Sequence, residues 1–265
     1  MTVQGIDISA DQGDFDWEAW KGRIGFAAIR ATTWTSETSF EADPQFARNW
    51  AQAYDASGGK LVRIAYHYTR PGVSPAAVQA RDFVSLVRDH GLEQGDHFMA
   101  DFENADGEPV PYVAGWSYTF CHSVNTEAPY HRVFPYFDQS WAAEGYAAAL
   151  THWHPWIAQY DVTRPAIPAG WKTWAFWQYR GTGLDRDVYN GSQEALLDFA
   201  RMPEKRRRSP PGAPATTPAT AGRSSSSPSP HARTTARATR PWPRSRHNWR
   251  KSCPLSPTCR PPTPR

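Results

Sequence analysis

The sequence has little cysteine and no long hydrophobic run. Three cysteines occur in 265 residues, and their spacing fits neither a disulfide framework nor a zinc site. No apolar stretch approaches the length of a membrane span, and we expect no signal peptide because Met1-Thr2-Val3 leads directly into an apolar segment. We therefore expect neither a disulfide-stapled domain nor insertion into a membrane.

Acidic residues are absent from residues 205–265. All 26 Asp and Glu lie before position 205 with 15 of the 29 Lys and Arg, so the net charge is −11 there and +14 in the rest. All 11 Tyr, all 12 Phe and 11 of the 13 Trp also lie before position 205. The sequence thus predicts a folded domain at residues 1–203, and a disordered basic tail at residues 204–265 because the tail has almost nothing to bury.

The tail has three interpretations that its composition does not separate. It is rich in Arg, Pro, Ser, Thr and Ala, and the change is abrupt near residues 203–209. It fits an out-of-frame translation of GC-rich coding sequence, a plain linker, or a basic arm attracted to anionic wall polymer or nucleic acid. Sequencing the source gene would separate these. We expect the protein to be a monomer without a nucleic-acid partner.

Two carboxylates close a short apolar run in Asp101-Phe102-Glu103, which follows His97-Phe98-Met99-Ala100. Alternate side chains of a strand share a face, so both carboxylates would point the same way, with Cα atoms about 6.5–7 Å apart. Glycoside hydrolysis uses such a pair, one carboxyl protonated and one ionised. Closeness of like charges helps to raise one of the two pKa values.

Strand-like and helix-like segments alternate along the first 200 residues. Asp43-Pro44 and Ser74-Pro75 are helix start signals. The pattern favours a parallel α/β barrel, in which active residues sit at the carboxyl ends of strands. We expect loops at residues 104–127 and 138–152, a modified loop at Thr33–Glu41, and an edge or bulge at Pro135. The expected strands are Gln4–Ser9, Phe26–Thr32, Leu61–Tyr68, His97–Glu103, Arg132–Phe137, Trp156–Tyr160, Trp174–Tyr179 and a piece near Asp187.

Several separated motifs, taken together, resemble glycoside hydrolase family 25, the Chalaropsis-type lysozymes or N-acetylmuramidases, which include many phage endolysins. The resemblance runs from about Val3 to about Phe199. It implies a flattened, irregular (β/α) TIM-like barrel that hydrolyses peptidoglycan without a cofactor. The motifs are Gly5-Ile6-Asp7-Ile8-Ser9, Asp16-Trp17, Phe26 to Thr32, Ile64 to Tyr68, Gln79-Ala80 with Phe83, Pro155 to Tyr160, Phe176 to Tyr179 and Asp185 to Tyr189.

The resemblance also suggests roles for four acids. Glu103 is the expected general acid, and Asp101 its ionised partner. Asp101 would either steady an oxazolinium formed by the substrate's N-acetyl group or orient a water, and the sequence does not separate these. Asp7 and Asp187 match acids lining the family's catalytic groove, although Asp185 is an alternative match for Asp187. Asp11 adds a fifth acid near the mouth.

Further side chains are candidates for sugar contact: Tyr66, Tyr160, Trp177 and Gln178. A buried barrel tyrosine is the alternative for Tyr66. His67 is expected to support the site through a hydrogen bond.

Three other functions remain alternatives. They are a catalytically silent glycan-binding module of the same fold, a chitinase or glucosaminidase on the same barrel, and a zinc amidase using His152 and His154. The amidase lacks a third ligand at sensible spacing, so no metal is expected. The family further implies a phage endolysin, made in the host cytoplasm and released to the cell wall through a holin-type pore.

Overall fold

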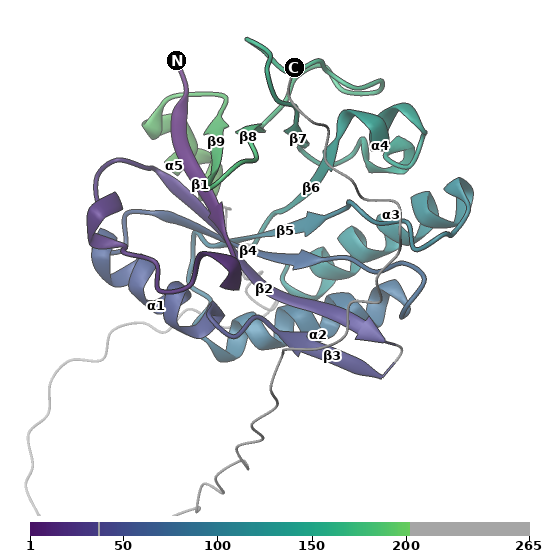
Figure 1. Cartoon of the computed structure of the whole chain (residues 1–265), viewed down its shortest axis with the longest axis horizontal. Coiled ribbons are helices and arrows are strands. Elements are labelled where there is room, and N and C mark those ends of the chain that lie inside the picture. Colours follow the sequence, from purple (N-terminus) through teal and green to yellow (C-terminus); the bar gives the residue numbers. More distant parts are fainter. Residues whose placement is uncertain (37, 202–265) are drawn as a thin grey trace, which may run out of the picture. The chain divides into compact units, whose positions relative to one another are not determined.

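The structure, a computed structural model, describes residues 1–36 and 38–201 (Figure 1). The predicted basic tail at residues 204–265 lies outside the described residues, so its disorder and the domain boundary stay predictions. Among the described residues, no helix is long and apolar enough to cross a membrane.

Eight strands close into a barrel with the neighbour order β1-β9-β8-β7-β6-β5-β4-β2, and β1 pairs with β2 to complete the ring. β9 runs antiparallel to both of its neighbours, whereas the other pairs in the ring are parallel. The barrel is therefore mixed, where a parallel one was expected. The ring strands are β1 Val3–Ile8, β2 Phe26–Ser36, β4 Val62–Tyr68, β5 His97–Asp101, β6 Val133–Asp138, β7 Trp156–Ala158, β8 Phe176–Arg180 and β9 Asp185–Tyr189.

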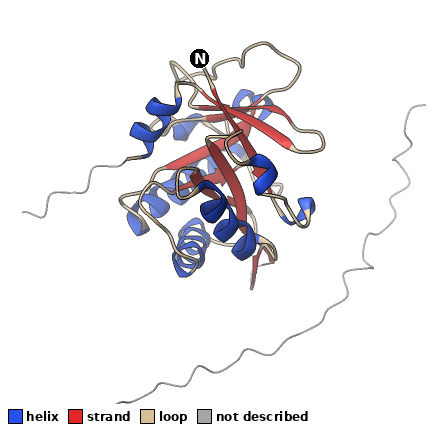
Figure 2. Cartoon of the chain, turned by 90° about the vertical axis from the view of Figure 1, so that its left-hand side faces the viewer, coloured by secondary structure: helices blue, strands red, loops and turns tan. Residues whose placement is uncertain are grey.

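The helices lie outside the strands (Figure 2). α1, α2 and α3 gather on one side of the barrel (Figure 1), and no α-helix separates β7, β8 and β9. This is the irregular (β/α) barrel that the sequence predicts. The α-helices are α1 Phe46–Ser57, α2 Ala76–Asp89, α3 Val110–Glu127, α4 Gln139–Ala143 and α5 Gln193–Ala200, and the 3₁₀ turns are η1 Ala10–Gln12, η2 Glu18–Trp20 and η3 Ala148–Leu150.

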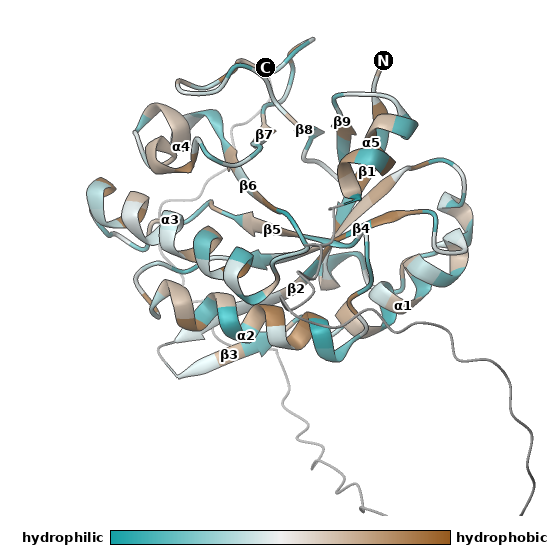
Figure 3. Ribbon diagram, turned by 180° about the vertical axis from the view of Figure 1, so that it is seen from behind, coloured by the Kyte–Doolittle hydropathy of each residue, from teal (hydrophilic) through white to brown (hydrophobic). Residues whose placement is uncertain are grey.

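Side-chain alternation divides the core into two layers. Inward residues such as Phe26, Met99, Phe134 and Phe176 fill the barrel, while the residues between them pack against the helices. Gly5 is required inside because a Cβ there would lie 2.2 Å from the Phe26 ring. The outer layer gives α2 an apolar face, seen as alternating brown and teal in Figure 3.

Four local expectations need correction. Residues 104–127 contain the long helix α3, and residues 138–152 contain α4 and η3. The expected loop at Thr33–Glu41 is largely a hairpin, because β2 continues to Ser36 and pairs with β3, Ser39–Ala42. Pro135 forces no bulge: β6 pairs with β5 in unbroken register there, and its pairing with β7 begins only at Tyr136.

Candidate active site

A cavity of about 300 Å³ opens at the end of the barrel where the parallel strands finish, and we call it the mouth cavity. Such ends hold the active residues of α/β barrels. Five carboxylates line it, and Arg30 is the one guanidinium among its lining side chains. The lining residues are Asp7, Ser9, Asp11, Gln12, Arg30, Tyr66, Tyr68, Met99, Asp101, Glu103, Tyr136, Tyr160, Gln178, Gly181 and Asp185.

Asp101 and Glu103 both reach the mouth cavity, as their spacing predicts. β5 ends at Asp101, and the next backbone hydrogen bond runs from Phe102 N to Tyr136 O at 2.9 Å. Phe102 is fully buried among the helices, so the flanking acids face the opposite way. Asp101 is buried at 6 % exposure, whereas Glu103 is exposed to the cavity.

Asp7 and the acids of β9 form a second group of carboxylates. Asp7 stands opposite Asp185 in the β1–β9 ladder, and Asp185 lines the mouth cavity. Asp187 faces the same side one step deeper, fully buried, and accepts a hydrogen bond from Trp156 Nε1 at 3.0 Å. Both β9 acids therefore flank Asp7, but only Asp185 borders the cavity.

Gln178 holds Asp7 in place. Its Nε2 donates to Asp7 Oδ2 at 2.6 Å, while its Oε1 accepts the hydroxyl protons of Tyr136, at 2.8 Å, and Tyr160. The two phenols fix the orientation of the amide, because its oxygen must face them. Gln178 was expected to touch sugar. The structure gives it a place in the cavity wall, as an anchor for Asp7.

The crowded carboxyls hold protons more tightly than usual. The pKa of Asp7 is raised to about 7, first by burial and then by Asp185 and Glu103, against the opposing effect of the Gln178 hydrogen bond. Burial and then Glu103 and Asp7 raise the pKa of Asp101 well above its ordinary value, with Arg30 opposing. The pKa of Glu103 is raised first by loss of water.

Arg30 is the residue that the sequence interpretation missed. Its Nε lies 2.7 Å from Asp43 Oδ2, and its Nη1 lies 3.8 Å from Asp11 Oδ2. Asp43 in turn accepts a hydrogen bond from Ala10 N at 2.9 Å. Arg30 follows Phe26 and Ala28 on the inward face of β2, so the same alternation that places Asp101 could have found it.

Two other residues that were expected to contact sugar, Tyr66 and Trp177, have different positions in the structure. Tyr66 lines the mouth cavity and is 7 % exposed, so it borders the site as a nearly buried side chain. Trp177 does not join it: between inward-facing Phe176 and Gln178, it packs outside the barrel, and its Nε1 donates to Gln159 O at 2.7 Å. His67 also faces outward and is fully buried, which lowers its pKa to about 4.

A second hollow of about 450 Å³ continues from the mouth cavity, and we call it the side cavity. Glu103, Tyr136 and Tyr160 line both, so the Glu103 carboxyl stands where the two meet. Together they form one space that extends on both sides of the Glu103 carboxyl. The side cavity's other lining residues are Ala105, Asp138, Ser140, Trp141, Glu144, Tyr146 and Ala158.

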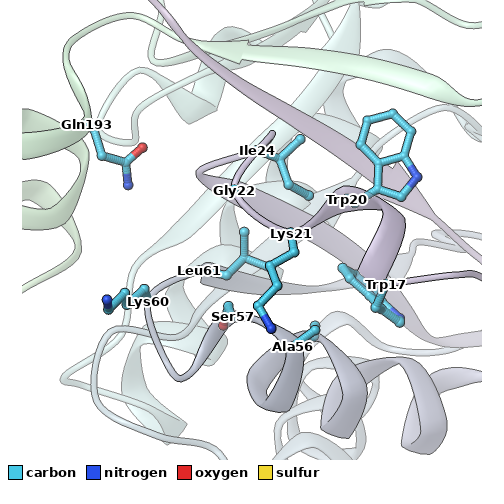
Figure 4. A pocket seen from close by; sticks show the side chains of 11 residues that line it. Trp17, Trp20, Lys21, Gly22, Ile24, Ala56, Ser57, Lys60, Leu61 and Gln193 are labelled. Carbon is cyan, nitrogen blue, oxygen red and sulfur yellow. The ribbon is translucent and has the colours of Figure 1, made fainter.

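A hollow of about 430 Å³ elsewhere on the barrel has different chemistry (Figure 4). Trp17, Trp20 and Ile24 supply apolar walls, and Lys21 and Lys60 supply its charged groups. It borders Leu61, just before β4, and Gln193, which begins α5, so it lies by the amino ends of the strands. Among the described residues, no carboxylate lines it, so these residues offer no acid–base pair.

No grouping of three or more potential metal ligands (His, Cys, Asp or Glu) occurs in the described part of the chain. His154 packs edge-on against Phe199, and His152 edge-on against Trp153. The geometry thus gives no support to the zinc amidase.

Comparison with known proteins agrees with this geometry. The sequence profile "Glycosyl hydrolases family 25" matches residues 6–188. Lysozyme M1 of Streptomyces globisporus is 32% identical over 223 residues, which cover 75% of this chain and 71% of that protein. N,O-diacetylmuramidase of Chalaropsis sp is 28% identical over 221 residues, covering 75% and 99%. The crystal structure of a lysozyme from Streptomyces coelicolor superposes with a TM-score of 0.61 at 27% identity, covering 75% of this chain and 97% of that one.

The profile match spans most of the barrel, including the strands that carry Asp7, Asp101 and Asp187. The predicted family and fold class are therefore confirmed. The chain belongs to glycosyl hydrolases family 25 and is a glycoside hydrolase of the muramidase (lysozyme) class.

Proposed function

We propose that this protein hydrolyses the β-1,4 bond between N-acetylmuramic acid and N-acetylglucosamine in peptidoglycan, with Glu103 as general acid and Asp101 as its partner. The observation that carries the proposal is the position of Glu103 at the junction of two cavities, with Asp101 on the same face behind it. A glycan chain lying along both cavities would place one glycosidic oxygen beside Glu103.

The electrostatics suit the reaction. The transition state of glycoside hydrolysis has oxocarbenium character, so positive charge develops on the sugar. A cavity lined by five carboxylates and one guanidinium stabilises that charge more than it stabilises the neutral substrate. The lining carboxyls that are ionised during the reaction would therefore contribute to catalysis.

The proton begins on the Asp101–Glu103 pair, because two close carboxyls, one of them buried, do not readily both ionise. Burial favours the proton on Asp101 before a sugar is bound. A bound sugar displaces water from the more exposed Glu103, which raises its pKa and draws the proton towards the leaving oxygen. Asp101, then ionised, faces the developing positive charge.

The first test is a digest of purified peptidoglycan by the full chain, followed by borohydride reduction and mass spectrometry of the new sugar ends. Reduced muramic acid at these ends supports the proposal. Reduced glucosamine at the ends, or faster release from chitin oligomers, would replace it with a glucosaminidase or chitinase. If the protein binds the cell wall but releases no sugar fragments, it would be the catalytically silent binding module.

We further propose that the enzyme serves a phage as an endolysin, released to the wall through a holin-type pore. The support is the family resemblance of the sequence. The role can be tested by expressing the protein, with and without a co-expressed holin, in a bacterium whose cell wall the purified enzyme digests. Lysis only with the holin is the expected result. Lysis without it, or none with it when purified enzyme digests the same wall, would overturn the proposal.

A further inference from the structure

The last backbone hydrogen bond to the sheet, from Phe102 N to Tyr136 O at 2.9 Å, comes one residue before Glu103. The last ladder pair of β5 is Asp101 with Tyr136, and Glu103 lies two residues beyond it. General-acid catalysis requires the carboxyl within about 3 Å of the glycosidic oxygen. Something after β5 must therefore hold this loop.

The structure points to Asp106. Its carboxylate accepts hydrogen bonds from Arg70 Nε at 2.7 Å and from Gly72 N at 3.2 Å, and its backbone N donates to Asn104 Oδ1 at 2.7 Å. The Asp106 side chain is 9 % exposed and that of Arg70 26 %, so water weakens the ion pair less than at a surface. Asp106 also adopts φ 52°, a left-handed backbone that aspartate tolerates better than most non-glycine residues.

Arg70 is itself anchored in the core. Gln79, fully buried on α2, donates from Nε2 to Arg70 O at 2.7 Å, and its Oε1 accepts from Arg70 N at 3.3 Å. Arg70 Nη1 also donates to Trp34 O of the β2–β3 hairpin at 3.3 Å. The loop after β5 is thus tied to the loop after β4 and to the hairpin.

Backbone contact completes the attachment. A Cβ on Gly72 would lie 2.7 Å from Asp106 Cβ, closer than real side chains approach. The absence of a side chain at position 72 lets the two loops touch. We define Arg70, Gly72 and Asp106 as the clasp.

We propose that the clasp positions the general acid: Asp106, held by Arg70 across Gly72, fixes the loop that places Glu103 between the two cavities. Asp106 and Arg70 do not line either cavity, so they act through Glu103. The inference rests on the proposed function for its catalytic meaning. The placement of Glu103 beside Asp101 can be measured without it.

The experiment compares Asp106→Asn with Asp96→Asn in the full chain. Asp96 precedes the same strand and makes a similar two-oxygen contact with buried Arg63, but away from the mouth cavity. Asp106→Asn should lower kcat about 10-fold with little change in KM, because a small displacement of a catalytic group costs rate more than binding. Asp96→Asn should lower thermal stability yet leave kcat and its pH profile unchanged.

The pH profile distinguishes positioning from stability. Freeing the loop lets Glu103 move into water, away from Asp138 and Asp185, so its raised pKa should fall and the basic limb of kcat should move to lower pH. Gly72→Ala should move the limb in the same direction with all charges kept, and Arg70→Lys should retain more activity than Arg70→Met. The titratable groups that face Glu103 are Asp7, Asp101, Asp138 and Asp185 with the phenols of Tyr68, Tyr136 and Tyr160.

A ¹³C NMR titration of the Glu103 carboxyl gives a readout that does not need hydrolysis. A lower pKa in Asp106→Asn than in the wild type supports the clasp even if peptidoglycan proves not to be the substrate. An unchanged Glu103 titration in a folded Asp106→Asn protein would overturn it. So would a loss of activity equal to that of Asp96→Asn at the same loss of stability.

Discussion

The two ends of strand β5 use aspartate in opposite ways. Before the strand, Asp96 accepts hydrogen bonds from Arg63 Nε at 2.9 Å and Nη2 at 2.5 Å, and the guanidinium lies 4.2 Å from the Trp50 ring centroid. After the strand, Asp101 and Glu103 face other carboxyls in a cavity whose guanidinium, Arg30, is paired with Asp43. The first end matches each buried charge with a partner, whereas the second concentrates charge of one sign. We infer that the first end stabilises the barrel and the second is organised for the reaction.

The strongest test of this division is Glu103→Gln. Loss of the general acid and of its negative charge should lower kcat at least about 10³-fold, while the isosteric amide leaves the fold intact. Turnover of wall fragments and circular dichroism measure the two effects. Glu194→Gln, on α5, is the matched control and should keep nearly full rate. Near-normal turnover by Glu103→Gln would contradict its role.

Arg63→Met tests the opposite end. It leaves Asp96 buried at 4 % exposure without its cation, and breaking a buried pair from one side costs about 3–5 kcal/mol. Urea denaturation should show that loss of stability. The kcat at low temperature should stay close to the wild-type value, because the substitution does not change the mouth cavity. A change below about 1 kcal/mol would mean that the pair contributes little.

The sequence predicted most of the barrel because the period-two pattern is strong where both faces of a strand are buried. All eight ring strands overlap the expected segments, and Asp101 and Glu103 share the expected face. In β8 the same alternation places Trp177 on the outer face of the barrel, so the pattern itself argues against a sugar contact there. Arg30 escaped notice because a single arginine in an apolar strand looks like an exposed edge residue until its partner Asp43 is located.

Other features depend on contacts that a local pattern does not contain. α3 begins beside Pro109 and Pro111 and carries Tyr and Trp on several sides, so its apolar face is poorly marked. β3 forms because its partner β2 runs beyond the barrel, not because Ser39–Ala42 favours a strand strongly. The clasp joins residues 36 positions apart, and nothing in Asp106-Gly107 marks it in advance.

The pH dependence of stability sharpens the comparison. The pKa of Asp7 is raised from 3.8 to about 7, so between about pH 4 and 7 the folded protein binds more protons than the unfolded chain. Stability should therefore fall as pH rises through this window, by up to about 1.4 kcal/mol per pH unit for one such group. Urea denaturation at pH 5, 6 and 7 measures the slope, and Asp7→Asn should reduce it. Stability that rises with pH in this window would show that paired acids elsewhere dominate.

The smallest expected effect concerns Asp187, the buried acid that does not line the mouth cavity, and it tests whether this residue affects stability. Burial and then Asp7 raise the pKa of Asp187 well above its ordinary value, so a neutral side chain suits the position. In Asp187→Asn the amide oxygen still accepts from Trp156 Nε1, and no second carboxylate can form beside Asp7 as the pH rises. We expect about 1 kcal/mol more stability at pH 8, measured by urea denaturation, and a lower Asp7 pKa by NMR. A less stable variant would mean that a hydrogen bond from protonated Asp187 to Asp7 stabilises the fold. The crowded carboxyls at the mouth would then stabilise one another through hydrogen bonds. The two ends of β5 would both contribute to stability, and they would differ only in the partner of the buried acid: another carboxyl at the mouth, and a guanidinium in the Arg63–Asp96 pair.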